Sequence, residues 1–300
     1  MSDDKNLAIY NHFLSAVFPV MRNLSLIMRH AESSALETSA NPLARFGAKV
    51  YSQNDEDGIT FEILRRVGIS SGVFAEFGVG DGTENNTLAL VARGWKGLWV
   101  GNQDLAFNTN PDGVQASAFS YQKAWITRSN IDQLFQQGMR SIRETQCQLI
   151  SLDLDGNDYY FVDALLKADA SPEVFIVEYN GKFIPPIRFV IDYNDQHNWT
   201  GNDYFGASFS SFVDLFAKYG YFPACCNITG SNAFFVKNKY KDRFRDVPDS
   251  HDLIYAPPKY FLGGLDTAGH PSSIAGIESL FRKLQAESAA RSSRTDYARH

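Results

Sequence analysis

The chain has 300 residues and a mass of 33.6 kDa, which suits one large globular domain with additions. Its 44% of hydrophobic and 21% of charged residues exclude a disordered or collagen-like chain. The formal net charge of -6 provides no overall basic surface, so nucleic acid is a poor candidate partner. Three cysteines, Cys147, Cys225 and Cys226, lack metal-ligand spacing and suit the reduced, buried thiols of a cytoplasmic protein.

The N-terminal region reads as a helical extension. Asp3 and Asp4 stand where a signal peptide would carry positive charge, and no segment approaches about 18 uninterrupted apolar residues, so we expect neither export nor a membrane span. Apolar residues over 5–30 recur near helical spacing, with Pro19 as a kink or stop, and residues 30–50 have the composition of a connector. We expect this extension to support a homo-oligomer.

Short apolar runs then alternate with helical patterns. This alternation predicts an α/β fold, in which helices cover both faces of a parallel sheet. Strands are expected at 73–77, 97–100, 117–126, 148–153 and 173–178, and helices at 84–93, 130–138, 159–168 and 209–219. The runs 221–228 and 232–237 are separated by a tight turn and predict a C-terminal antiparallel hairpin, unlike the six parallel strands of the dinucleotide-binding fold.

The sharpest motif follows the first expected strand. Glu76 precedes Gly78, Gly80 and Gly82, a G-x-G-x-G spacing in which the backbone can approach a ligand closely. A dinucleotide site would have G-x-G-x-x-G and an apolar residue in place of Glu76. A carboxylate repels pyrophosphate but attracts the ammonium and sulfonium groups of S-adenosylmethionine, so the motif favours that cofactor. A glycine-rich turn with a structural glutamate is the alternative interpretation.

A ribose contact is expected directly after the second expected strand, 97–100. The residues there are Gly101, Asn102, Gln103 and Asp104, where an acidic residue that accepts from both ribose hydroxyls is usual. Either Asn102 or Gln103 makes neutral hydrogen bonds to the ribose, or Asp104 reaches back to it. Glu84 is a further candidate, although an acidic residue early in a helix can simply complement the helix dipole.

Acidic residues follow two further strands. Asp153 and Asp155 project to one face of their strand, and Glu178 and Asn180 end the next one. The carboxyl edge is where open α/β sheets bind ligands, and oxygen ligands of this kind suit Mg²⁺ or another divalent cation. His197, in a long polar insert, could be a base or a further ligand. Helix capping explains Asp158 equally well, and a surface position explains His197.

Two other functions fit parts of these motifs. The Asp153/Asp155 pair also occurs as Asp-x-Asp in glycosyltransferases that bind a nucleotide sugar through a metal ion. A cofactor-binding module without catalysis, which recruits a partner through its helical N-terminus, is the third interpretation. Binding of a nucleotide sugar would favour the glycosyltransferase. Binding of S-adenosylmethionine without any methyl acceptor would favour the non-catalytic module.

Together these motifs resemble those of class I S-adenosylmethionine-dependent methyltransferases, most closely the FkbM-like bacterial small-molecule and glycan O-methyltransferases. The resemblance covers roughly residues 50–240. It is carried by Tyr51-Ser52-Gln53 with Glu56-Asp57-Gly58, by Glu76 to Gly82 with Glu84-Asn85-Asn86, by Asp153 to Asp158, and by Glu178-Tyr179-Asn180. It implies a Rossmann-like, doubly wound, seven-stranded sheet with a reversed final strand. Gly101 departs from the acidic residue that is commoner at its position.

The resemblance implies methyl transfer from S-adenosylmethionine to a hydroxyl of a sugar, glycan or secondary metabolite, with no nucleic acid involved. The resemblance itself implies the cofactor contacts of Glu76, Gly78, Gly80 and Gly82, and the other site residues are assigned from the motifs described above. Cofactor contacts are expected at Gln53, Glu76, Gly78, Gly80, Gly82, Glu84, Asn85, Asn102 and Asp153, catalytic roles at Asp153, Asp158 and His197, and a divalent cation at Asp155, Glu178 and Asn180. The expected organisation is an extension over 1–48, a methyltransferase domain over 49–282 and a disordered tail over 283–300.

Overall fold

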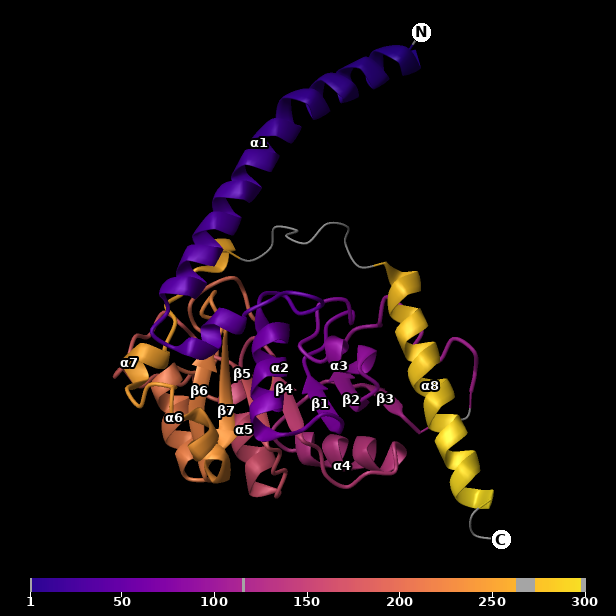
Figure 1. Ribbon diagram of the computed structural model, residues 1–300, viewed down its shortest axis with the longest axis vertical. Helices are drawn as coiled ribbons and strands as arrows, with labels where there is room; N and C mark the ends of the chain where they lie inside the picture. Colours follow the sequence, from indigo (N-terminus) through magenta and orange to yellow (C-terminus); the bar gives the residue numbers. More distant parts are fainter. Residues whose placement is uncertain (1, 115–116, 263–272, 298–300) are drawn as a thin grey trace.

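A computed structural model describes residues 2–114, 117–262 and 273–297 of the chain. Helices and strands alternate through most of it, with a few short 3₁₀ helices (η) between them (Figure 1). In chain order the elements are α1 (Ser2–Thr38), η1 (Pro42–Phe46), α2 (Glu56–Val67), β1 (Val73–Phe77), α3 (Leu88–Ala92), β2 (Lys96–Gly101), β3 (Phe119–Lys123), α4 (Ile131–Ser141), β4 (Leu149–Leu152), α5 (Asp158–Lys167), β5 (Val174–Glu178), α6 (Phe209–Ala217), β6 (Tyr221–Cys226), β7 (Asn232–Lys237), η2 (Asn238–Phe244), α7 (His251–Ile254), η3 (Tyr260–Leu262) and α8 (Ile274–Tyr297).

The strands form one seven-stranded sheet in the order β3-β2-β1-β4-β5-β7-β6. Neighbouring strands from β3 to β5 are parallel, whereas β7 is antiparallel to both β5 and β6. The β6–β7 hairpin turns through residues 227–231, where the backbone N–H of Gly230 donates to the carbonyl of Asn227. The predicted α/β class, the Rossmann-like sheet and the reversed final strand are therefore confirmed.

Burial explains why the central strands are largely apolar, with Glu76 in β1 and Ser151 in β4 as buried polar exceptions. Every residue of β1 and of β4 is buried, as expected for a sheet covered by helices on both faces. Helix α4 packs on β2 and β3, and α6 packs on β6. Large aromatic side chains fill these layers, including the fully buried Phe74 and Trp99. This core fixes the positions of the loops that follow the strands.

The N-terminal helix is longer than the sequence pattern predicts. Helix α1 continues through Pro19 to Thr38, so the expected connector over residues 30–50 begins only after Thr38. Its C-terminal end contacts η1 and η3, while its N-terminal part projects away from the sheet (Figure 1). None of the helices within the described ranges has the length and apolar composition that crossing a membrane requires.

The C-terminal segment also differs from the expectation of a disordered tail over 283–300. Helix α8 runs through Tyr297, and residues 298–300 lie outside the described residues. Phe281 is fully buried, and its ring lies 4.7 Å from the ring of Phe119 and 5.8 Å from that of Trp99, measured between centroids. The Ser/Ala/Arg-rich composition suggests disorder, but the apolar positions at the start of the segment anchor the helix on the sheet.

Candidate functional site

A polar pocket of about 200 Å³ lies at the carboxyl edge of the sheet. Loops that follow β1, β2, β3 and β4 line it, together with part of the insert between β5 and α6. The lining residues are Gly78, Gly80, Gly101, Asn102, Gln103, Ala124, Trp125, Ile126, Asp153, Leu154, Asp155, Asn157, Phe161, His197 and Asn198. Four separate stretches of the sequence motifs thus meet in one place, where open α/β sheets bind ligands.

The glycine loop forms one wall of this pocket by its backbone. Gly78 has φ 91°, and a Cβ atom there would lie 1.6 Å from the carbonyl oxygen of Asp153, so no other residue fits. Gly80 has φ 52°, and a Cβ atom there would meet none of the described atoms within 4 Å. Gly82 lies one turn further, where its N–H donates to the carbonyl of Val79. The open space above Gly80 is available to a ligand.

Glu76 binds the end of the segment that follows the glycine loop, and it is not among the residues that line the pocket. One of its oxygens accepts from the backbone N–H of Asn86 at 2.9 Å, and the other accepts from the N–H and hydroxyl of Thr87. Trp99 donates its indole N–H to the same hydroxyl at 2.8 Å. Burial raises the pKa of Glu76 to about 7, despite these hydrogen bonds. Its observed contacts are structural, and a direct cofactor contact stays a prediction.

The residues after the glycine loop are arranged differently from the expected helix 84–93. Residues 82–87 form turns and α3 begins only at Leu88, so Glu84 is not in a helix. Glu84 is exposed, and its carboxylate lies 3.8 Å from the Lys49 ammonium. Asn85 is buried, and its Oδ1 has no hydrogen-bond partner among the described residues. Gln53 is exposed, and its carbonyl accepts from Lys49 at 3.0 Å.

The three residues predicted as alternative ribose contacts differ in their positions at the end of β2. Asn102 and Gln103 line the pocket, whereas Asp104 is exposed and forms an ion pair with Lys123 at 2.7 Å. A Cβ atom on Gly101 would lie 2.9 Å from a methyl group of Val79, which favours glycine over the commoner acidic residue there. Neutral amides thus border the pocket at this strand end.

Sequence reasoning missed the apolar side of the pocket. Trp125 and Ile126 follow β3, and Phe161 lies in α5. The indole N–H of Trp125 donates to the carbonyl of Asp195, which ties this wall to the polar insert. The available signal was positional, because residues after a third parallel strand also reach the carboxyl edge.

Three carboxylates converge beside the pocket. Asp153, Asp155 and Glu178 each offer an oxygen within 4.8 Å of the others. Burial raises the pKa of Asp153 and of Glu178 well above the usual range, and the negative charges of the neighbouring carboxylates raise both further. Burial also raises the pKa of Asp155, while the nearby imidazole of His197 opposes this shift. Within the described ranges, no lysine or arginine forms an ion pair with any of the three.

Asp158 is a structural residue of the same loop. Its two carboxylate oxygens accept from the backbone N–H groups of Leu154 and Gly156, each at 2.8 Å. Asp158 is fully buried, and burial raises its pKa to about 6. These bonds hold the turn in which Asp155 adopts φ 53°. Both donors precede α5, and its N-cap residue Asn157 makes no side-chain capping bond, so Asp158 orders the turn before the helix and does not cap it.

Asn180 anchors the insert that follows β5. Its amide nitrogen donates to the carbonyls of Asp203 at 2.8 Å and of Phe205 at 3.1 Å, and its oxygen accepts from the N–H of Lys182. Both ends of the amide are therefore engaged by the backbone of residues 182–205. This arrangement differs from the predicted cation ligand.

His197 reaches the pocket from the same insert. Its Nε2 atom is buried and has no hydrogen-bond partner among the described residues. The ring packs against the backbone of Gly156, where an added Cβ atom would lie 2.3 Å from its Cδ2. The structure thus brings His197 beside Asp155, with one ring nitrogen free to accept or donate a proton.

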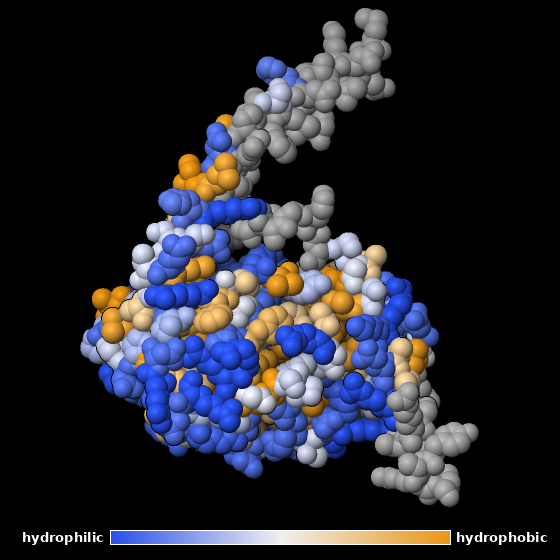
Figure 2. Space-filling view, viewed as in Figure 1, coloured by the Kyte–Doolittle hydropathy of each residue, from blue (hydrophilic) through white to orange (hydrophobic). Residues whose placement is uncertain are grey.

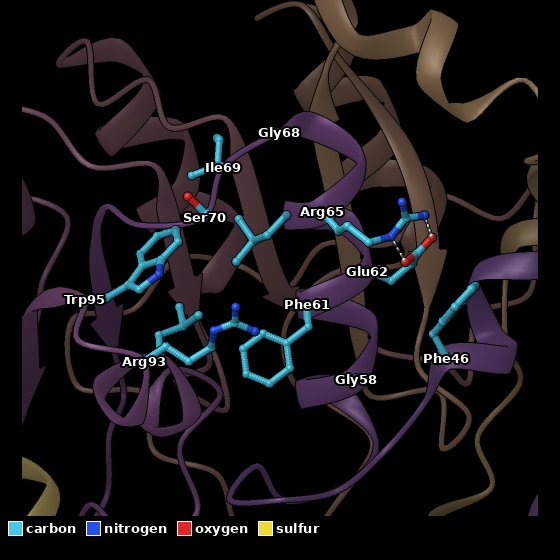
Figure 3. Close-up of a pocket in the computed structure, with 12 residues that line it drawn as sticks. Phe46, Gly58, Phe61, Glu62, Arg65, Gly68, Ile69, Ser70, Arg93 and Trp95 are labelled. Atoms are coloured by element: carbon cyan, nitrogen blue, oxygen red, sulfur yellow. Dashed lines mark hydrogen bonds and ion pairs between the residues drawn. The ribbon is translucent and has the colours of Figure 1, made fainter.

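A larger groove of about 520 Å³ lies elsewhere, along α2 and the segment before β2 (Figure 3). Phe61, Leu64 and Trp95 line it, and the guanidinium of Arg93 lies 5.0 Å from the centre of the Phe61 ring. Figure 3 also shows the Arg65–Glu62 ion pair on its rim. The groove shares no lining residue with the carboxyl-edge pocket. Its charged lining residues are Glu62, Arg65 and Arg93, whereas the carboxyl-edge pocket is lined by two aspartates and a histidine.

Comparisons with known proteins add little to this geometry. No protein-family model matches the chain, and no curated protein matches it. Among solved structures, the chain is similar to an O-methyltransferase family 2 protein from Planctomyces limnophilus DSM 3776, crystallised in complex with apigenin. The sequences are 12% identical, the TM-score is 0.31, and the match covers 72% of this chain and 61% of that chain. The chain therefore spans less than two thirds of the length of this neighbour.

Proposed function

We propose that the protein is an S-adenosylmethionine-dependent methyltransferase. The observation that carries this proposal is the pocket at the carboxyl edge, where Gly80 leaves open space at the end of β1. The methionine part of the cofactor would lie along the glycine loop toward Asp153. Asn102 and Gln103 would bind the ribose, and Trp125 and Ile126 would cover the adenine with apolar surface.

We assign the acceptor as a hydroxyl compound, a sugar, glycan or secondary metabolite. The acceptor oxygen bonds to the methyl carbon as the sulfur–methyl bond breaks, and the bonding electrons leave with the sulfur, which becomes neutral. The hydroxyl proton must go to a base, and His197 has an unpartnered Nε2 beside the pocket. Asp153 is the second candidate base, whereas the two backbone bonds of Asp158 assign it to positioning the loop.

A divalent cation such as Mg²⁺ completes the proposal. Asp153, Asp155 and Glu178 fit such an ion, because oxygens of two half-buried carboxylates and of the exposed Asp155 approach one another without an ammonium or guanidinium partner in the described ranges. When bound, the cation would lower the pKa of the acceptor hydroxyl. The carboxylates would hold it at the side of the pocket that faces β5.

Calorimetry with the full chain tests the cofactor first. We expect S-adenosylmethionine and S-adenosylhomocysteine to bind with micromolar affinity. Gly80→Ala should weaken binding at least tenfold, because the new Cβ atom points into the open space of the pocket. Gly220→Ala is the matched control, since Gly220 also has a positive φ, 78°, and open space, but lies in the turn between α6 and β6.

Three results would contradict the proposal. Absence of binding to the wild-type protein would remove the cofactor assignment, and equal affinities for both alanine variants would remove the role of Gly80. Protection by a nucleotide sugar, but not by S-adenosylmethionine, would instead favour the glycosyltransferase interpretation of the Asp153/Asp155 pair.

A further inference from the structure

Two residues that are paired across neighbouring strands, Asn232 and Glu178, each carry an unpartnered buried oxygen. Asn232 opens β7 and is paired with Glu178, the last residue of the antiparallel neighbour β5. The Oδ1 atom of Asn232 and the Oε2 atom of Glu178 are buried, and neither has a hydrogen-bond partner among the described residues. Asn232 is only 2% exposed. A buried acceptor without a donor is costly, so this pair of oxygens requires an explanation.

Glu56, the first residue of α2, fixes the orientation of the Asn232 amide. Its Oε1 atom accepts from the Nδ2 of Asn232 at 3.1 Å and from that of Asn227 at 2.7 Å. Its Oε2 atom accepts from the N–H of Asn54 at 2.9 Å. The nitrogen of the Asn232 amide must therefore point at Glu56, and its oxygen is left on the other side.

The same arrangement places this oxygen at the carboxylate cluster. Glu178 belongs to the cluster and lies directly across the strand pair from Asn232, a spacing at which side chains on one face meet. The negative charge of Glu56 also raises the pKa of Asp153, which supports a position of the Glu56–Asn232 pair near the cluster. The loop after β4 supplies two acceptors, β5 and β7 supply one each, and Glu56 of α2 lies next to Asn232; oxygen acceptors of this kind suit a divalent cation.

We propose that the Oδ1 atom of Asn232 is the neutral fourth ligand of a divalent cation held by Asp153, Asp155 and Glu178. Glu56 is a positioning residue that orients the amide toward the ion. This inference rests on the cation of the proposed function and is independent of cofactor binding. It replaces Asn180, whose amide oxygen accepts from Lys182 and whose nitrogen anchors the insert.

Manganese binding by the full chain, without any cofactor, tests the proposal. Titration followed by electron paramagnetic resonance should show one bound Mn²⁺ per chain. Asn232→Ala should raise the dissociation constant at least tenfold, and Glu56→Gln should raise it severalfold, as loss of an orienting group does at metal sites. Asn180→Ala, the matched control, should change it less than twofold, with folding of each variant checked by circular dichroism.

A measurement on the wild-type protein avoids any folding defect of the variants. Mn²⁺ should broaden the side-chain amide NMR signals of Asn232 well before those of Asn180. Equal broadening of the two signals, or equal Mn²⁺ affinity of Asn232→Ala and the wild type, would overturn the assignment of Asn232. Absence of Mn²⁺ binding at millimolar concentration would overturn the cation itself, while S-adenosylmethionine binding would still stand or fall by calorimetry.

Discussion

The imidazole of His197 packs against the backbone of Gly156 so closely that there is no room for a methyl group on Gly156. A Cβ atom at Gly156 would lie 2.3 Å from Cδ2 and 3.0 Å from Nε2 of the ring. Gly156 also donates its N–H to Asp158, so its own position is fixed. The glycine therefore determines where His197 stands relative to Asp155 and the pocket.

We expect Gly156→Ala to displace His197 while preserving the fold. Gly156 is not among the glycines with positive φ, so the backbone there can accept alanine. The new methyl group would instead clash with the ring of His197. S-adenosylmethionine affinity should fall about tenfold, because small displacements of a binding group have large effects. Calorimetry on a double-mutant cycle with His197→Ala measures the coupling. An equal loss in both backgrounds would show that Gly156 acts independently of His197.

A second prediction concerns the pH dependence of stability. Burial raises the pKa of Glu76 to about 7 from its usual 4.5, so between these values the folded state binds more protons than the unfolded state. The contribution of Glu76 to the free energy of unfolding is therefore fully present below pH 4.5 and is lost as the pH rises through about 7. Its upper limit is on the order of 3 kcal/mol.

Urea unfolding at pH 5 and pH 8 measures this contribution. Other buried carboxyl groups with raised pKa values, such as Asp57, should make the wild-type protein lose stability in the same direction. The difference between the wild type and Glu76→Gln isolates Glu76, because glutamine does not titrate. We expect the variant to be less stable at both pH values and to show a flatter pH dependence. An identical slope for the two proteins would contradict the raised pKa.

The fold and the glycine loop after β1 could be predicted from local sequence. β1 has the predicted bounds, because a five-residue run with four apolar residues that ends before a glycine leaves little choice of strand position. Gly78 was recognisable for the same reason, since its positive φ and its contact with Asp153 both exclude a side chain. The convergence of Asp153 with Glu178 followed from the rule that parallel strands end at a common edge.

The positions of several polar side chains near the carboxylate cluster could not be predicted. Asp155 belongs to the cluster, whereas Asp158 accepts from the backbone of the turn with positive φ that lies between β4 and α5. Asn180 is drawn to the carbonyls of Asp203 and Phe205, which belong to a loop of no regular pattern. Asn232 lies opposite Glu178 through antiparallel pairing, and no local sequence motif signals that register.

A third prediction concerns α8. Phe281 is fully buried among Phe107, Phe119 and Trp99, with ring centroids 4.7 to 5.8 Å away. Phe281→Ala should lower the free energy of unfolding by about 3 to 5 kcal/mol, through lost apolar burial and the cavity left behind. Ile274→Ala is the control at an exposed position of the same helix, where about 0.5 kcal/mol or less is expected.

This helix should also affect the cofactor site. A Cβ atom on Gly82 would lie 3.0 Å from the Phe107 ring, so Phe107 connects α8 with the glycine loop. We therefore expect Phe281→Ala to weaken S-adenosylmethionine binding severalfold under conditions where the protein remains folded. Chemical denaturation and calorimetry on the same preparations measure both effects. Unchanged stability would show that α8 is not anchored by Phe281.

The last prediction concerns the projecting part of α1. Val20, Leu24 and Ile27 follow one another at i, i+4 and i+7, so they form one apolar stripe, and they are 64%, 44% and 66% exposed. Figure 2 shows apolar surface on this helix, away from the mostly polar body. A helix gains most of its stability from tertiary contacts, so an exposed stripe on a projecting helix favours association with a second copy.

We expect a dimer in light scattering at micromolar concentration. Replacing Val20, Leu24 and Ile27 with serine should shift the protein to monomers without changing S-adenosylmethionine affinity, because the pocket lies at the sheet edge and contains no residue of α1. Serine at the already polar position Asn23 is the matched control and should leave the dimer intact. A wild-type protein that stays monomeric at all concentrations, or a triple variant that stays dimeric, would exclude this stripe as the interface.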